Sequence, residues 1–336
     1  MASRSEAKDR AAQEWRGVCN VIMPSYTADL SALNEEAIRH DVRRNIELGF
    51  WGALIVSECG TTLPEFVRFM EICVQEAAGR QTFLVHATFD TVQQTIEMVQ
   101  AGERVGMGGV LLGHPNSFYP VSEDELYGHV ATVANATALP VCLFVTAQMN
   151  LTRLHPSGYP PAVIARACAL PNVVAVKYEV GRPGIAGDME VYELIKDTGA
   201  LFSDPFEAHS PVSVRYFGQQ WMGTSNFEYW GGRVPQYFNL LQSGDIDAAM
   251  KIYWSIQPAR TARMNVQGTV AGANLIHRYL WKYQAWLNGY NGGPMRQPVM
   301  KLGDGQMHAV RDPLIKCGFD ISDEGPLDFY VGRIRA

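Results

Sequence analysis

The chain has 336 residues, of which 47% are hydrophobic and 18% charged, and its formal net charge is −6. This is the composition of a globular protein long enough to bury a large core. The sequence has no stripe of Lys and Arg, which excludes a nucleic-acid partner recruited by charge. Residues 1–13 are polar and lack the apolar stretch of a signal peptide, and no apolar run approaches the ~20 residues that cross a bilayer. We therefore expect a cytoplasmic protein with no membrane partner and a flexible segment over residues 1–13.

The cysteines form no C-x-x-C pair, and several lie in apolar runs. This pattern favours buried thiols in a reducing compartment over disulfides or a zinc site. The six positions are Cys19, Cys59, Cys73, Cys142, Cys168 and Cys317.

Short apolar runs rich in β-branched residues alternate with longer segments of helical periodicity through the first two thirds of the chain. The predicted strands are residues 18–23, 53–56, 83–86, 109–112, 141–145, 173–176, 200–202 and 220–223. The clearest predicted helices between them are residues 34–48, 91–102 and 122–137. Ser122 followed by Glu125 predicts a capping box at the start of the third helix.

Eight strand–helix units favour a (β/α)8 TIM barrel over residues 14–235. The rival, a doubly wound sheet, needs a phosphate-binding glycine loop after an early strand. The nearest candidate begins at Gly106, but it precedes a strand and has Leu111 where the third glycine belongs. We therefore predict the barrel.

The strand–helix alternation stops after Gly231. Residues 234–241, 246–256 and 271–287 have helical periodicity, and a loop rich in Gly and Pro follows at 288–298. We expect residues 236–336 to be a mostly helical C-terminal extension of the barrel.

Lys177 differs from the other lysines because it ends a strand-like apolar run. Barrels of this type carry their active sites at the carboxyl ends of the strands. Burial there favours the neutral amine, which can attack a carbonyl and form an iminium that acts as an electron sink. The alternative is a structural lysine paired with Glu179 or another acid.

The segment LPNVVAVKYEVG at residues 170–181 resembles the Schiff-base strand of the dihydrodipicolinate synthase / N-acetylneuraminate lyase superfamily. Further segments resemble other strands of that superfamily in the same order, at residues 17–24, 84–91, 112–127 and 139–144. The resemblance implies a class I lyase in which Lys177 forms the Schiff base.

Within the superfamily the chain is most similar to the hydratase-aldolases that act on benzylidenepyruvate-type compounds. The similar segments are residues 22–24, 112–115, 175–178 and 286–298. This resemblance implies a carbon–carbon lyase that uses a 2-oxo acid such as pyruvate and a bulky, aromatic aldehyde. It also implies no dissociable cofactor, no metal, and a homo-oligomer, either a dimer or a tetramer.

The loop after the second strand departs from the family pattern. Relatives have Gly-Thr-Thr-Gly-Glu there, which binds the carboxylate of pyruvate, whereas this chain has Ser57-Glu58-Cys59-Gly60-Thr61-Thr62. Either Thr61 and Thr62 bind the carboxylate in a shortened loop, or Glu58 matches the family glutamate and the threonines are lost. We also expect Ser57, in the same loop, to contact the substrate. A glutamate that faces the site repels a substrate carboxylate.

Phe144 stands where the family has its catalytic tyrosine, and phenylalanine carries no proton to transfer. Another group must then act as the acid–base, and the nearest titratable candidates by strand position are Glu58, His114 and His86, in that order. Each histidine is alternatively a structural residue. We expect Phe144 itself to contact the substrate.

Two further loops supply candidate substrate-binding residues. Asn116 and Tyr119 follow the fourth strand, where Tyr119 is a candidate for lining an aromatic pocket, and Ser225 follows the eighth strand. After the seventh strand, Asp204, Glu207 and His209 have the side chains of metal ligands but not the spacing of a known motif, so we expect no metal there.

Two other functions remain open at this point. The chain could be a relative that uses a non-pyruvate carbonyl substrate, as another lyase, a decarboxylase or a hydrolase. It could also be a barrel that has lost catalysis and serves as a binding or regulatory protein. Lys177 favours an enzyme, whereas Phe144 and the reordered loop favour a change of substrate or function.

Overall fold

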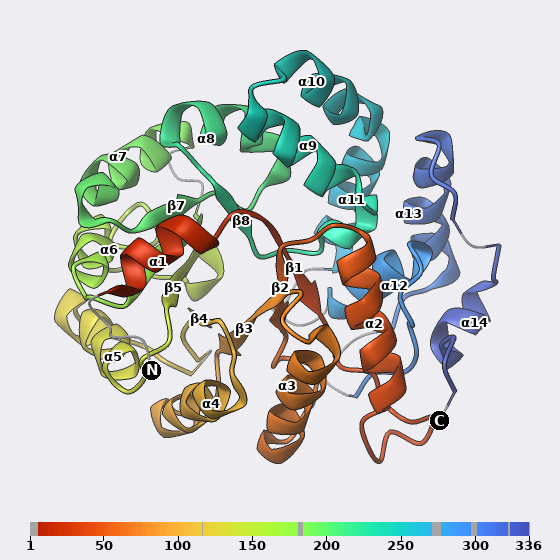
Figure 1. Cartoon of the computed structure of the whole chain (residues 1–336), viewed down its shortest axis with the longest axis horizontal. Coiled ribbons are helices and arrows are strands. Elements are labelled where there is room, and N and C mark those ends of the chain that lie inside the picture. The colour runs from red at the N-terminus through yellow and green to blue at the C-terminus, as the bar shows by residue number, and fades with distance from the viewer. Residues whose placement is uncertain are drawn as a thin grey trace. The chain divides into compact units, whose positions relative to one another are not determined.

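The computed structural model describes residues 6–115, 117–180, 184–270, 277–296, 301–321 and 323–335. Strands and helices alternate along the chain up to residue 223, and helices alone follow (Figure 1). Among the described residues, no helix is long and apolar enough to cross a membrane.

Eight strands form one sheet in the order β7-β6-β5-β4-β3-β2-β1-β8, and the pairs for which the register is described are parallel. The strands are β1 (Gly17–Ile22), β2 (Gly52–Ile55), β3 (Thr82–Ala87), β4 (Gly109–Leu112), β5 (Val141–Thr146), β6 (Val173–Glu179), β7 (Leu201–Ser203) and β8 (Trp221–Gly223). The two strands at the ends of this order are joined by Ser203, whose hydroxyl accepts from the Gly223 amide at 3.2 Å. The predicted (β/α)8 barrel is confirmed.

The three helices predicted between the strands begin where the sequence places them. Asn34, Thr91 and Ser122 each accept a hydrogen bond from a backbone amide three residues later, which satisfies a donor that a helix start otherwise leaves free. Only one of the two hydrogen bonds of the predicted capping box forms at Ser122. The Ser122 hydroxyl accepts from the Glu125 amide, but the Glu125 carboxylate accepts from the Val121 amide instead of the Ser122 amide. The helices are α2 (Glu35–Glu47), α3 (Leu63–Ala77), α4 (Val92–Val105), α5 (Glu123–Asn135), α6 (Pro161–Cys168), α7 (Ile185–Ile195) and α8 (Ser210–Phe217).

Gly106, the nearest candidate for a phosphate loop, has another role. It caps the end of α4 at φ 92°, a left-handed conformation that glycine adopts without strain. Gly106 therefore ends a helix, and it does not belong to the phosphate-binding loop that a doubly wound sheet would need.

The chain divides into two compact units, and the boundary crosses β1. The first unit is Met1–Cys19 with Thr82–Thr224, and the second is Asn20–Gln81 with Ser225–Ala336. In the first unit, helices α5 to α8 follow one another around the outer side of the strands (Figure 1). Lys177 belongs to the first unit, and the loop after β2 belongs to the second.

The first unit also contains α1 (Ala7–Glu14), where the sequence predicts a flexible segment. Ala7 and Ala11 are buried, and the Lys8 amino group donates to the backbone carbonyls of Cys168 and Thr198. The polar residues that suggested flexibility are therefore the outer face of a short docked helix. Trp15, which follows it, packs on Trp221 with ring centres 4.8 Å apart.

The second unit contains the C-terminal helices, so the predicted helical extension is confirmed. They are α9 (Arg233–Ser243), α10 (Ile246–Ser255), α11 (Gln257–Val270), α12 (Arg278–Leu287), α13 (Asp304–Lys316) and α14 (Pro326–Val331). The predicted helix 271–287 is seen only as α12, because residues 271–276 lie outside the described part of the chain. All six cysteines are free, and five are buried, as predicted.

Candidate active site

Lys177 lies within β6, which continues to Glu179 beyond the predicted end of the strand. Residues two apart on a strand share a face, so Lys177 and Glu179 point the same way. The Lys177 amino group is 3.0 Å from a carboxylate oxygen of Glu179, and the lysine is only 4% exposed. Lys177 is thus buried and paired with Glu179, and its role as the reactive amine stays a prediction.

Phe144 on β5 is the register partner of Lys177, and its ring centre lies 4.1 Å from the Lys177 amino nitrogen. A phenyl face attracts a cation, but it can neither donate nor accept a proton. Phe144 therefore holds the amino group in place without supplying acid–base chemistry.

Two thiols lie in the same part of the first unit. Burial raises the pKa of Cys142 to about 12 and raises the pKa of Cys19 well above its usual range, although the charge of Lys177 opposes both shifts. Both thiols are therefore protonated at neutral pH. They contribute apolar packing around the lysine rather than a nucleophile.

His114 follows β4 and is part of a buried aromatic cluster. A ring nitrogen of His114 lies 3.2 Å from the hydroxyl of Tyr159, and the His114 ring is 4.7 Å from that of His129. Burial lowers the pKa of His114 well below its usual range and also lowers the pKa of His129, which the Gly113 backbone opposes. The cluster is therefore neutral at physiological pH.

This cluster makes the fold sensitive to acid. The unfolded histidines take up protons as the pH falls through about 6.5, whereas the folded ones resist, so stability present above pH 6.5 is lost below it. We expect His129→Phe, which keeps the ring contacts with His114 and Phe118, to lower the dependence of unfolding free energy on pH between 7 and 5. Urea unfolding at a series of pH values measures this, and an unchanged slope would contradict it.

The other candidates of the first unit lie in different surroundings. A ring nitrogen of His86 is 3.1 Å from the Thr88 hydroxyl. Tyr119 is 70% exposed, with the Arg153 guanidinium 3.7 Å above its ring, so it faces solvent in this structure. Asn116 lies outside the described residues.

Asp204 and His209 form a pair after β7, with their carboxylate oxygen and ring nitrogen 2.8 Å apart. The same carboxylate raises the pKa of His209 and accepts from the Phe206 amide, which shapes the turn into α8. Glu207 bonds the backbone of Ala208. No group of three metal-ligating side chains is found among the described residues.

In the second unit, the two threonines of the loop after β2 differ in what their hydroxyls contact. Thr62 caps α3, because its hydroxyl accepts from the Glu65 amide and the Glu65 carboxylate accepts from the Thr62 amide. The Thr61 hydroxyl is buried and has no hydrogen-bond partner among the residues that the structure describes. Of the pair, Thr61 is the residue whose hydroxyl is not used by the helix cap.

Glu58 in the same loop is neutralised by an ion pair with Arg278, the first residue of α12. One turn later on the same helix, the Lys282 amino group donates to the Pro24 carbonyl at 2.7 Å. Burial lowers the pKa of Lys282 to about 8, opposed by Asp41. The polar face of α12 is thus bonded to the loops after β1 and β2, and the repulsion expected from Glu58 is offset.

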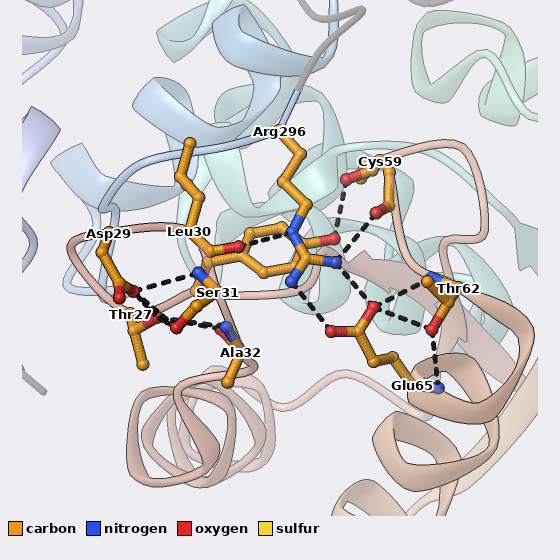
Figure 2. A network of polar contacts seen from close by, with 11 residues as sticks. Thr27, Asp29, Leu30, Ser31, Ala32, Cys59, Thr62, Glu65 and Arg296 are labelled. Carbon is orange, nitrogen blue, oxygen red and sulfur yellow. Dashed lines mark hydrogen bonds and ion pairs between the residues drawn. The ribbon is translucent and has the colours of Figure 1, made fainter.

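Arg296 also contacts this loop, and it bonds to the first turn of α3 as well (Figure 2). Its guanidinium makes two bonds of 2.6 and 2.8 Å to the Glu65 carboxylate and donates to the carbonyls of Gly60 and Leu30. The same group lies 4.2 Å from the ring centre of Tyr26, whose hydroxyl donates to the Cys59 carbonyl. These contacts therefore fix the loop at Cys59 and Gly60 and fix the first turn of α3 at Glu65.

Ser57 lies at the start of this loop and is partly buried. Ser225 follows β8 and also belongs to the second unit, where the Arg263 guanidinium contacts its hydroxyl at 3.5 Å.

Sequence reasoning did not identify Arg278, Lys282 or Arg296 as residues that shape the loops. The sequence offered one signal for the first two: Arg278 and Lys282 are four residues apart, on one face of a predicted helix with few other charges. From the sequence, Glu179 was expected only as a structural partner of Lys177.

The profile of the Dihydrodipicolinate synthetase family matches residues 14–314. The chain belongs to this family. Accordingly it is a class I aldolase-type lyase that acts on pyruvate-type substrates. It is 25% identical over 286 residues to a 4-hydroxy-tetrahydrodipicolinate synthase of Desulforudis audaxviator, covering 83% of this chain and 90% of that protein. It is also 25% identical over 320 residues to the same enzyme of Acidothermus cellulolyticus, covering 92% and 94%.

Solved structures of the dihydrodipicolinate synthetase family share the fold. The dihydrodipicolinate synthase of Oceanobacillus iheyensis matches with a TM-score of 0.77 at 13% identity, covering 93% of this chain and 99% of that one. An N-acetylneuraminate lyase of Fusobacterium nucleatum matches with a TM-score of 0.72 at 18% identity, covering 90% and 98%. These likenesses show the shared fold, and the match to the family over residues 14–314 confirms the family resemblance of the sequence.

Proposed function

We propose that Lys177 forms the Schiff base and that the enzyme makes or cleaves a carbon–carbon bond between a 2-oxo acid, such as pyruvate, and a bulky aromatic aldehyde. The observation that carries the proposal is the Lys177 amino group, 4% exposed on β6 and held between the Phe144 ring and the Glu179 carboxylate. An amine so placed can attack a ketone, and the resulting iminium accepts the electron pair of the adjacent bond.

The loop after β2 is the proposed binding site for the carboxylate of the 2-oxo acid. Thr61 supports this role with a buried hydroxyl that has no hydrogen-bond partner in the described part of the chain, and Arg278 offsets the repulsion of Glu58. A site that hydrogen-bonds a substrate group rejects analogues that lack it, because its own buried polar atom is then left without a partner.

The aromatic aldehyde is proposed on the resemblance of residues 22–24, 112–115, 175–178 and 286–298 to the benzylidenepyruvate hydratase-aldolases. We expect purified enzyme to condense pyruvate with benzaldehyde or 2-hydroxybenzaldehyde at least ~10-fold faster than with propanal, since an aromatic ring buries more apolar surface. The absorbance of the benzylidenepyruvate product, with chromatography for the propanal product, measures both rates. A preference for propanal would contradict the aromatic partner and leave the Schiff base standing.

Phe144 and the reordered loop favour one alternative, a family member that uses a carbonyl compound other than pyruvate. Replacing pyruvate in the same assay by 2-oxobutanoate, 2-oxoglutarate and an uncharged ketone discriminates between the two. A barrel that only binds its ligand would turn over none of them. We also propose a homo-oligomer, a dimer or a tetramer, on the resemblance to the family.

A further inference from the structure

The contact between Lys177 and Glu179 has a chemical consequence that depends on the proposed Schiff base. Iminium formation needs a group that moves protons between the lysine nitrogen and the substrate oxygen. Phe144, the register partner of Lys177, cannot do so. Glu179 is a carboxylate 3.0 Å from the nitrogen that reacts.

Other titratable groups near β6 are placed less well for this role. Tyr178 points to the opposite face of the strand, where its ring packs 6.0 Å from that of Phe202, and burial raises its pKa to about 12. The Cys142 thiol is protonated for the same reason. His114 contacts the Tyr159 hydroxyl within a neutral aromatic cluster.

Glu179 also differs from Lys177 in its access to water. Its side chain is 28% exposed, whereas that of Lys177 is 6% exposed. A carboxylate that contacts the buried amine and still reaches solvent can exchange protons with water, and so can work in repeated cycles.

We propose that Glu179 is the catalytic acid–base of Schiff-base formation in this enzyme. The carboxylate takes a proton from the Lys177 ammonium, and the free amine attacks the carbonyl carbon while the oxygen receives that proton. Glu179 then takes a second proton from nitrogen and gives it to the hydroxyl of the carbinolamine, which leaves as water. One ammonium and one ketone thus become one iminium and one water, and the carboxylate is regenerated.

The first test is the rate at which pyruvate is trapped on Lys177 by cyanoborohydride, followed by intact mass. Glu179→Gln keeps the size of the side chain but cannot carry the proton, so we expect trapping to slow by ~10²–10⁴-fold. The matched control is Glu193→Gln, which removes a carboxylate from another Glu–Lys ion pair, on the surface of α7, and should trap at the wild-type rate.

The second test separates proton transfer from a merely structural ion pair. Glu179→Ala opens space beside Lys177, and added formate can then carry the proton in place of the lost carboxylate. We expect the trapping rate of Glu179→Ala to rise in proportion to formate concentration, with no such rise in wild type or in Glu193→Ala. If Glu179 has only a structural role, formate should not raise the trapping rate. The rates with and without formate are measured on the same sample of Glu179→Ala, so partial unfolding cannot account for a difference between them.

The outcomes distinguish this inference from the proposed function. If wild type traps pyruvate at Lys177 while Glu179→Gln traps equally fast and Glu179→Ala ignores formate, the role of Glu179 is overturned and the Schiff base stands. If wild type forms no adduct with pyruvate, the pyruvate Schiff base is overturned and the role of Glu179 in forming it falls with it.

Discussion

Lys177→Met is expected to reduce carbon–carbon bond cleavage and formation to background, a loss on the order of 10⁴-fold or more in kcat, because removal of a covalent catalyst leaves only binding. Methionine keeps an apolar stem against the Phe144 ring but has no amine. Steady-state kinetics with pyruvate and an aromatic aldehyde measures the effect.

Lys196→Met is the matched control. Lys196, which directly follows the end of α7, also pairs with a glutamate, but on the exposed surface, where an ion pair contributes little to stability. It should retain the wild-type kcat. A Lys177→Met enzyme that keeps kcat within ~10-fold of wild type would show that the reaction does not pass through this lysine.

Arg296→Met is expected to lower the free energy of unfolding by about 2–3 kcal/mol, because it leaves the Glu65 carboxylate without its bidentate partner and frees two backbone carbonyls of loops in the second unit. Both ion-pair side chains are largely buried, at 17% and 22% exposed, so solvent screens the pair only partly. Urea unfolding measures the loss, and we expect KM for the 2-oxo acid to rise as the loop loosens.

The same pair predicts a dependence on acid. Bonds from Arg296 lower the pKa of Glu65 to about 2, from the ordinary 4.5, so its contribution is present above pH 4.5 and is lost as the pH falls towards 2. In Arg296→Met that loss should be smaller. The control is Arg68→Met, which removes a more exposed guanidinium from two glutamates and should cost less than about 1 kcal/mol. If both variants lost the same free energy of unfolding, the proposed stabilisation of the loop by Arg296 would be contradicted.

The barrel could be predicted because its signals are local. Alternating apolar runs mark strands, and Asn34, Thr91 and Ser122 mark helix starts through bonds made within four residues. The helix α1 could not be predicted in this way. Its stability comes from Lys8, which reaches carbonyls more than 150 residues away in the chain, and such contacts leave no local pattern.

The site could be predicted only in part for the same reason. Lys177 and Phe144 lie on strands, where the register follows from the fold, so their pairing could be expected. The ion pair of Glu58 with Arg278 joins residues 220 positions apart, and Thr61 and Thr62 differ only through the cap that Thr62 forms. Glu179 was within reach of sequence reasoning, since two residues along a strand share a face. Its importance depended on the strand continuing past Lys177.

The most direct measurement is the mass of the peptide that contains Lys177 after the enzyme is reduced with borohydride in the presence of pyruvate. We predict that this peptide gains one reduced pyruvyl group on Lys177, that Lys282 on α12 stays unmodified despite its pKa of about 8, and that Lys177→Met gains nothing. An adduct on Lys282 in place of Lys177, or none on any lysine, would contradict this prediction.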